Sequence, residues 1–340
     1  MAKEGRKPAA KRENAKKAAA RSQTRVSGDE VIFEAAWLYY HDDLNQSEIA
    51  DRLGVSRATV VNYLQEARER GIIRVHLAED PFLRHRLAVE LVEKLGRYGL
   101  KAAFIVPSEK SMRDEDVLIR VAKGAATWLP KLLQPGDTLG IAWGRTVYEV
   151  AEALEPTPID DMRVVQLVGS MSSPYGFSVE ICSAHLAQRL GARCVNLHAP
   201  AILSNAKLAE ALRNEPIIHA QIEALSHCNK AIFAAGSCTP QSHIVGSGIA
   251  SRADLDTYIK AGAHGVLCGR FIDANGKQIQ GTLDSRMIGV TLDRLTDLDM
   301  GLLVSSGGDK VEPMRAVIRG GYASHVVTDV ITAEAMLKGL

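Results

Sequence analysis

The sequence predicts an α/β protein in which an N-terminal helix–turn–helix module precedes a doubly wound, mainly parallel sheet. Eight short apolar runs between residues 102 and 328 alternate with helix-like stretches, and most of the runs contain Val, Ile, Leu and Ala without polar alternation. Such runs are typical of parallel strands that are buried on both faces and covered by helices on each side. Residues 46–64 show two helical patterns on either side of a glycine, as in a helix–turn–helix.

These patterns divide the 340 residues into four segments. We expect a disordered basic tail over 1–27, the helix–turn–helix domain over 28–80, a connector helix over 81–98 and the α/β domain over 99–340. A composition of 46% hydrophobic and 24% charged residues suits a soluble globular protein. No apolar run approaches the roughly 18 residues that span a bilayer, no secretory signal is evident, and the five cysteines form no C-x-x-C pair. We therefore expect a cytoplasmic protein with no membrane partner, no disulfide framework and no zinc site.

The positive charge is concentrated at the N-terminus. Residues 1–27 hold nine Lys or Arg and two Glu, so that 32 of the 41 basic and 38 of the 40 acidic residues lie in the rest of the chain. A basic segment without aromatic residues cannot build a core. It could neutralise nucleic-acid phosphates or serve only as a solubilising tail, and both interpretations stay open.

The helix–turn–helix pattern is the strongest motif in the sequence. Ile49 and Leu53 form the buried stripe of its first helix, and Gly54 can adopt the left-handed conformation that ends that helix. Ser56 is a natural N-cap for the second helix, which buries Val60 and Leu64. An amphipathic helix ending near residue 41 precedes the motif, and the run 72–77 alternates like a strand and predicts a short wing.

Polar side chains at the starts of both helices have the chemistry that recognises base edges and phosphates. A purely structural helical hairpin is the alternative, but the glycine turn, the serine cap and the exposed arginine in register favour DNA binding. We predict that the DNA-contacting residues are Gln46, Ser47, Ser56, Arg57, Ala58, Thr59 and Asn62.

Leucines recur every fourth residue from Leu83 to Leu95 and predict one helix over 82–98. This stripe can pack on its own domain or pair with its copy in a partner subunit. We favour a connector helix that also contributes to dimerisation. The strands predicted beyond it cover residues 102–106, 138–142, 164–168, 194–197, 231–235, 265–268, 302–304 and 325–328.

Open parallel sheets bind ligands beyond the carboxyl ends of their strands. Gly144, Arg145 and Thr146 follow the second predicted strand, and close backbone approach, a guanidinium and a helix-capping hydroxyl together suit a phosphate. Lys310 follows another strand within a glycine-rich loop and suits a second anionic contact. A surface arginine and a simple cap are the alternative for Arg145 and Thr146.

Three further loops offer polar groups to a sugar. Gly169 and Ser170 begin a Gly- and Ser-rich loop, and Gly236 follows another strand, although both segments could be ordinary connections. Asp273 could accept hydrogen bonds from sugar hydroxyls, but an aspartate before an Asn-Gly pair is equally typical of a turn. Together these loops predict a polyol or sugar ligand that carries a phosphate. The G-x-S-x-G, Walker A and H-E-x-x-H motifs are absent, so we predict no catalytic residue, no cofactor and no metal.

With these residues identified, the chain resembles the SorC family of sugar-binding transcriptional regulators over roughly residues 29–338. The resemblance rests on Tyr39-Tyr40, Gln46–Ala50, Leu53–Arg57, Ala67-Arg68, Gly71-Ile72, Gly140, Trp143–Thr146, His198–Pro200, Gly269–Phe271, Asp273, Gly276, Ile288-Gly289, Lys310, Arg319–Tyr322 and Thr328-Asp329. It implies an effector domain with the fold of sugar-phosphate isomerases and glucosamine-phosphate deaminases, and assembly as a dimer or tetramer. By position it assigns the effector site to Gly144, Arg145, Thr146, Gly169, Ser170, Asp273 and Lys310. The family usually has two glycines three and four places before the lysine. Here those places hold Gly307 and Ser306, which shifts the glycine-rich turn by one residue.

We therefore predict a DNA-binding transcriptional regulator of a carbohydrate or polyol operon. Double-stranded operator DNA, a small sugar or polyol and further copies of the chain are its predicted partners. One alternative is a sugar-phosphate isomerase or deaminase with an appended DNA-binding module, but fold alone does not fix function. A nucleoid-binding protein that relies on the basic tail is the other.

Overall fold

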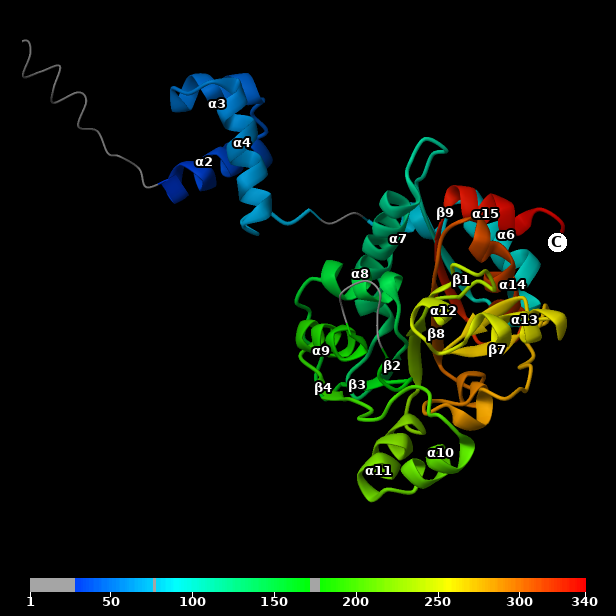
Figure 1. The fold of residues 1–340 in the computed structure, drawn as a ribbon. Coiled ribbons are helices and arrows are strands. Elements are labelled where there is room, and N and C mark those ends of the chain that lie inside the picture. Colours follow the sequence, from blue (N-terminus) through cyan, green and yellow to red (C-terminus); the bar gives the residue numbers. More distant parts are fainter. Residues whose placement is uncertain (1–27, 76–77, 172–177) are drawn as a thin grey trace, which may run out of the picture. The chain divides into compact units, whose positions relative to one another are not determined.

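The computed structural model describes residues 28–75, 78–171 and 178–340, so the predicted basic tail over 1–27 lies outside the described residues. The described residues form two compact units, which are divided after residue 77 (Figure 1). Within the described residues, every helix is too short or too polar to cross a lipid bilayer. Each unit has its own hydrophobic core and is described separately below.

The first unit consists of three helices: α2 (Gly28–Tyr40), α3 (Gln46–Leu53) and α4 (Arg57–Glu69). Asn45 caps α3 and forms a reciprocal capping box with Glu48. Gly54 ends α3 with φ of 67°, a left-handed conformation that costs glycine little because it has no Cβ. The Ser56 hydroxyl then accepts the Thr59 amide at the start of α4, as the sequence predicts. Residues 72–75 form no strand, so the predicted wing is wrong there, and residues 76–77 lie outside the described part.

The second unit is built on a seven-stranded sheet with the order β1-β9-β8-β5-β2-β3-β4. All neighbours in this sheet pair in parallel, which confirms the predicted parallel α/β class. The strands are β1 (Ala102–Val106), β2 (Thr138–Ile141), β3 (Arg163–Gln166), β4 (Arg193–Val195), β5 (Lys230–Phe233), β8 (Met300–Val304) and β9 (His325–Asp329).

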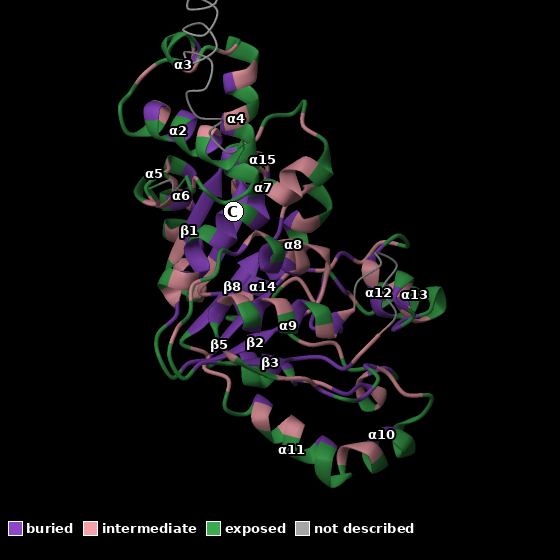
Figure 2. Cartoon of the chain, turned by 90° about the vertical axis from the view of Figure 1, so that its left-hand side faces the viewer, coloured by how far each residue is buried: buried purple, intermediate pink, exposed green. Residues whose placement is uncertain are grey.

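Helices cover both faces of the sheet. Successive strand residues alternate between two hydrophobic clusters, so that Ala103 and Ile105 of β1 belong to one and Phe104 and Val106 to the other. The strands form the buried centre of this unit in Figure 2. One face is covered by α6 (Arg86–Leu95), α13 (Arg252–Lys260), α14 (Val311–Arg319) and α15 (Val330–Leu337), and the other by α7 (Asp114–Trp128), α8 (Arg145–Ala153) and α9 (Val179–Leu190).

The remaining elements connect these layers. Helices α10 (Ala206–Arg213) and α11 (Pro216–Leu225) contribute to a small separate cluster with residues that follow β4. The short helices are α5 (Asp80–Leu83), η1 (Gly96–Tyr98), η2 (Leu129–Leu132), α12 (His243–Gly246), η3 (Asp284–Arg286), η4 (Leu292–Leu295) and η5 (Gly308–Lys310).

The segment predicted as one connector helix is divided into α5, α6 and η1, all within the second unit. Leu87, Leu91 and Leu95 are fully buried in the core on one face of the sheet. The stripe therefore packs on its own domain, and these leucines are not available to pair with a partner subunit.

The predicted strand over 265–268 also differs from expectation. It forms β6 (Gly265–Leu267), which pairs antiparallel with β7 (Arg270–Ile272) in a separate hairpin. Its buried apolar residues resemble those of a central strand, because the hairpin packs into the same core as the helices of that face. The sequence analysis missed β7, whose three residues are too few to show a pattern.

A buried ion pair joins the amino-terminal ends of two central strands. The Lys230 ammonium lies 2.6 Å from the Asp137 carboxylate, and both side chains are 9% exposed. Asp137 also accepts hydrogen bonds from the Asn229 side chain and the Gln134 amide. Burial alone would raise the pKa of Asp137, but the hydrogen bonds from Lys230 and Asn229 hold this pKa below its usual value.

Replacing only one member of this pair leaves a buried charge without its partner. We expect Lys230→Met to lower the free energy of unfolding by about 3 kcal/mol. The double variant Lys230→Met/Asp137→Asn removes both charges and keeps an acceptor for the Gln134 amide, so it should lose less. Urea unfolding followed by circular dichroism measures both, and a double variant no more stable than the single one would contradict the interpretation.

Candidate functional site

A cavity of about 690 Å³ opens at the carboxyl-terminal edge of the main sheet. Residues that follow β1, β2, β5 and β8 line it, together with Asp329 at the end of β9. The chain proceeds from β2 to β3 on one side and from β5 to β8 on the other, so adjacent β2 and β5 mark the topological switch point of the sheet. Ligands of doubly wound sheets bind at this position.

The first group of lining residues is the predicted sequence Gly144, Arg145 and Thr146. Gly144 precedes α8 with φ of 141°, a conformation that side chains disfavour, and α8 begins at Arg145. The amides of the first turn of a helix have no intrahelical partner, and they attract anions together with the helix dipole. Arg145, whose side chain is 34% exposed, forms an ion pair with Glu115 of α7, which also lines the cavity.

Lys310 and Gly236 line the same cavity. The Lys310 ammonium donates to the buried Ser237 hydroxyl at 3.2 Å and lies 3.1 Å from an oxygen of Asp309. Gly307, which occupies one of the two glycine positions of the family, takes the positive φ of this loop. Gly236 exchanges two backbone hydrogen bonds with Val266, which joins the loop after β5 to the β6–β7 hairpin. The structure thus brings five of the eight predicted effector residues to one cavity.

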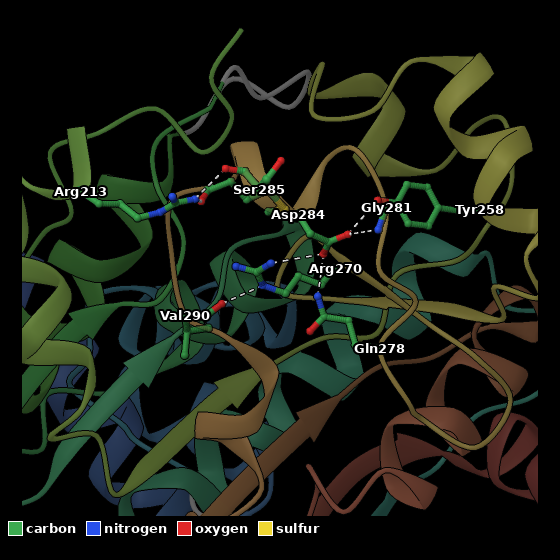
Figure 3. Close-up of polar contacts among 9 residues, drawn as sticks. Arg213, Tyr258, Arg270, Gln278, Gly281, Asp284, Ser285 and Val290 are labelled. Carbon is green, nitrogen blue, oxygen red and sulfur yellow. Dashed lines mark hydrogen bonds and ion pairs between the residues drawn. The ribbon is translucent and has the colours of Figure 1, made fainter. Parts of the chain in front are cut away.

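The turn of the hairpin, Cys268 and Gly269, forms another part of the lining. Figure 3 shows the polar network that fixes the following residue, Arg270. Its guanidinium donates to the Val290 carbonyl and pairs with Asp284 at 3.3 Å, and Asp284 also accepts from Tyr258 and Gln278. Arg270 is 5% exposed, so this network supports the hairpin rather than a solvent-facing site.

Three predicted effector residues are not among those that line the cavity. The Asp273 carboxylate accepts the backbone amides of Asn275 and Lys277, both at 2.9 Å, which is the turn chemistry considered as its alternative. Gly169 is buried and donates its amide to the Ile288 carbonyl. Ser170 hydrogen-bonds to Glu180, and residues 172–177 of the same loop lie outside the described part.

The structure adds cavity residues that the sequence analysis did not select. Trp143 packs on His243 with ring centroids 4.3 Å apart, and both line the cavity with Glu115 and Asp329. Asp329 is 2% exposed and caps α15. Trp143 stands beside the predicted Gly144 and was detectable from sequence, whereas His243 and Glu115 come from segments far away in the chain.

The predicted DNA-contacting residues lie at the starts of α3 and α4. Arg57 donates to the Gln46 side chain at 3.2 Å and so links the two helix starts. Ala58 and Asn62 are exposed and one turn apart, on one face of α4. Ser47 is also exposed, whereas Ser56 and Thr59 hydrogen-bond to each other at 2.8 Å and form the cap.

A helix–turn–helix unit followed by an α/β unit with a polar cavity defines the class of ligand-binding transcriptional regulators. The family model "Putative sugar-binding domain" matches residues 86–338, and a model of the MarR family matches residues 35–80. The chain therefore belongs to the sugar-binding transcriptional regulators of the SorC type.

Individual proteins are similar over nearly the whole chain. The uncharacterized transcriptional regulator YjhU of Escherichia coli K12 is 33% identical over 93% of this chain and 98% of its own. The deoxyribonucleoside regulator of Bacillus subtilis is 29% identical over 92% and 98%. The crystal structure of the sorbitol operon regulator SorC from Klebsiella pneumoniae, at 24% identity, matches with a TM-score of 0.74 over 92% of this chain and all of that one, which shows a shared fold. The enzyme alternative finds no support among these relatives.

His243 gives a test of the electrostatics of the cavity. Burial and then the charge of Lys310 lower the pKa of His243 to about 4. We expect Lys310→Met to raise this pKa while leaving it below 6.5, because burial remains. The unfolded chain takes up the proton first, so stability should be lost as pH falls from 6.5 towards 4.

An NMR titration of the imidazole protons measures this pKa, and the variant His243→Gln assigns the signal. A His243 signal that titrates near 6.5 in the unchanged protein would contradict the buried environment.

Proposed function

We propose that this regulator senses a phosphorylated sugar or polyol and controls a carbohydrate or polyol catabolic operon in the cytoplasm. The supporting observation is the cavity in which Arg145, Lys310 and the start of α8 lie together. A phosphate placed before α8 would meet the amides of the first helical turn and a guanidinium, and both stabilise anions.

The rest of the cavity suits the sugar or polyol part of this effector. The Ser237 hydroxyl and the carboxylates of Asp309 and Glu115 can exchange hydrogen bonds with hydroxyl groups, and Trp143 offers an apolar ring face. Relatives named for deoxyribonucleosides and for sorbitol support an effector of this chemical class.

The helix–turn–helix unit is the proposed operator-binding part. Ser47, Arg57, Ala58 and Asn62 present the side chains that would meet phosphates and base edges, and Gln46 positions Arg57. Such units bind paired half-sites as dimers, so we propose that the protein acts as a homo-oligomer. An effector then changes operator affinity if it binds one arrangement of the paired units better than another.

A thermal-shift comparison of sugars and polyols with their phosphate esters tests the effector class. A phosphate ester at a hundred times its dissociation constant should stabilise the protein by about 2.7 kcal/mol, whereas its parent sugar should act weakly. We expect Arg145→Ala to raise the concentration of the ester that gives the same stabilisation at least tenfold. The reason is that it removes a charge-assisted contact of about 1.5–3 kcal/mol.

Lys277→Ala is the matched control, because Lys277 is an exposed cation that does not line the cavity. Stabilisation by free sugars but not by their phosphate esters would refute the proposal that the effector carries a phosphate. Loss of DNA binding by Arg145→Ala without any effector would make Arg145 a structural residue.

Operator contact is tested separately at Arg57. We expect Arg57→Ala to weaken binding to an operator fragment, identified by footprinting, by roughly tenfold or more. The affinity of this variant for DNA should also depend less on the salt concentration. Fluorescence anisotropy at several salt concentrations measures both effects. Arg252→Ala, which changes an exposed arginine of the α/β unit outside the cavity, serves as the control. Equal affinity of Arg57→Ala and the unchanged protein would refute this DNA-contacting role.

A further inference from the structure

Helix α7 connects the effector cavity to the segment with which the α/β unit begins. Its first two turns contribute Asp114, Glu115 and Leu118 to the cavity lining. The Glu115 carboxylate is the ion-pair partner of Arg145. An anion that binds Arg145 therefore competes with Glu115 for the same guanidinium. Because half of the Glu115 side chain is exposed, its carboxylate can separate into water at little cost.

The middle of α7 is held closely against the sheet. A Cβ at Gly124 would lie 2.6 Å from Cγ1 of Val106, so the backbone of α7 packs directly on the Val106 side chain of β1 there. Val121, Ala122 and Ala125 are fully buried on the same side. A helix of 15 residues spans about 22 Å and moves as a rigid element. A displacement at one end is thus carried to the other.

The far end of α7 contacts the start of the unit. Lys131, in the η2 turn that follows α7 directly, forms an ion pair with Glu79, whose side chain is 13% exposed. Phe82 stacks on Phe104 with centroids 4.7 Å apart, and Phe104 lies 5.6 Å from Trp128, the last residue of α7. The Glu79 carbonyl accepts the amides of Phe82 and Leu83.

Glu79 stands two residues after the boundary between the two units at residue 77. The contacts that hold Glu79 and Phe82 therefore also hold the first residues of the α/β unit, which follow the DNA-binding unit in the chain. Figure 1 shows α7 in the α/β unit, and η2 continues it.

We propose that α7 is the element that transmits effector binding: an anion at Arg145 releases Glu115, and the resulting shift of α7 loosens the hold of Lys131 and Trp128 on residues 79–83. This inference rests on the proposed function, because Arg145 is the group that the effector's anion would meet. Glu115 then acts as an internal substitute for that anion in the effector-free protein.

Hydrogen exchange of the full chain tests the connection without any ligand. Glu115→Gln breaks the ion pair with Arg145, and we expect it to accelerate exchange at the amides of Phe82, Leu83 and Arg84 roughly threefold or more. Asp116→Asn is the matched control: it also breaks an ion pair between a first-turn carboxylate of α7 and an arginine, Arg113, but neither residue lines the cavity.

A second variant tests the far end. Lys131→Met should accelerate exchange at the same amides and abolish any further response to Glu115→Gln, whereas Lys123→Met, at an exposed lysine of α7, should change neither. Unchanged exchange in Glu115→Gln would overturn the proposal. A response to Glu115→Gln that is equally large with and without Lys131→Met would overturn it as well.

Inorganic phosphate distinguishes this proposal from the proposed function. If both hold, phosphate should reproduce the effect of Glu115→Gln at Phe82–Arg84 in the unchanged protein and have none in Arg145→Ala. If Glu115→Gln accelerates exchange but phosphate neither binds nor acts, the anion site is refuted while transmission through α7 stands. If phosphate slows exchange at residues 144–147 but leaves 82–84 unchanged, the anion site stands and transmission is refuted.

Discussion

The parallel direction of the seven main strands is the constraint on which the rest of the α/β unit depends. Because the pairings are all parallel, the carboxyl ends of β1, β2, β5, β8 and β9 meet at one edge of the sheet. Segments separated by more than two hundred residues thereby contribute to a single cavity. The same direction requires a crossover after each strand, and these crossovers supply the helices on both faces.

The alternation of side chains along each strand divides the hydrophobic core into two layers. Residues of β1 alternate between the layer that contains α6 and the layer that contains α7. The leucines of α6 are fully buried in the first layer, so they are not available for a contact with another subunit. In the second layer α7 and α8 both begin at the cavity, so the pair Arg145–Glu115 joins two helix starts. The proposed effector would therefore meet elements that extend through the α/β unit.

The two cations predicted for the cavity already have partners within the chain. Arg145 contacts Glu115, and Lys310 contacts Asp309 and Ser237. An anionic effector must exchange these partners instead of filling a purely positive pocket. Such an exchange makes binding and internal rearrangement the same event, and this is the property that a sensor requires.

The sequence by itself determined the features that depend on neighbours within a few residues. These features are the capping residues, the glycine that ends α3, the buried face of α3 with Ile49, and the apolar runs of the sheet. They are visible in the sequence because helix periodicity and capping act over one or two turns. Arg145 was also detectable, since it directly follows a predicted strand.

Only the tertiary structure decided which distant segments meet. It paired β6 with β7 outside the main sheet, left Asp273 in its turn, and brought Glu115 and His243 to the cavity. Strand order and loop proximity follow from the packing of segments tens to hundreds of residues apart, and a local pattern carries no record of that packing.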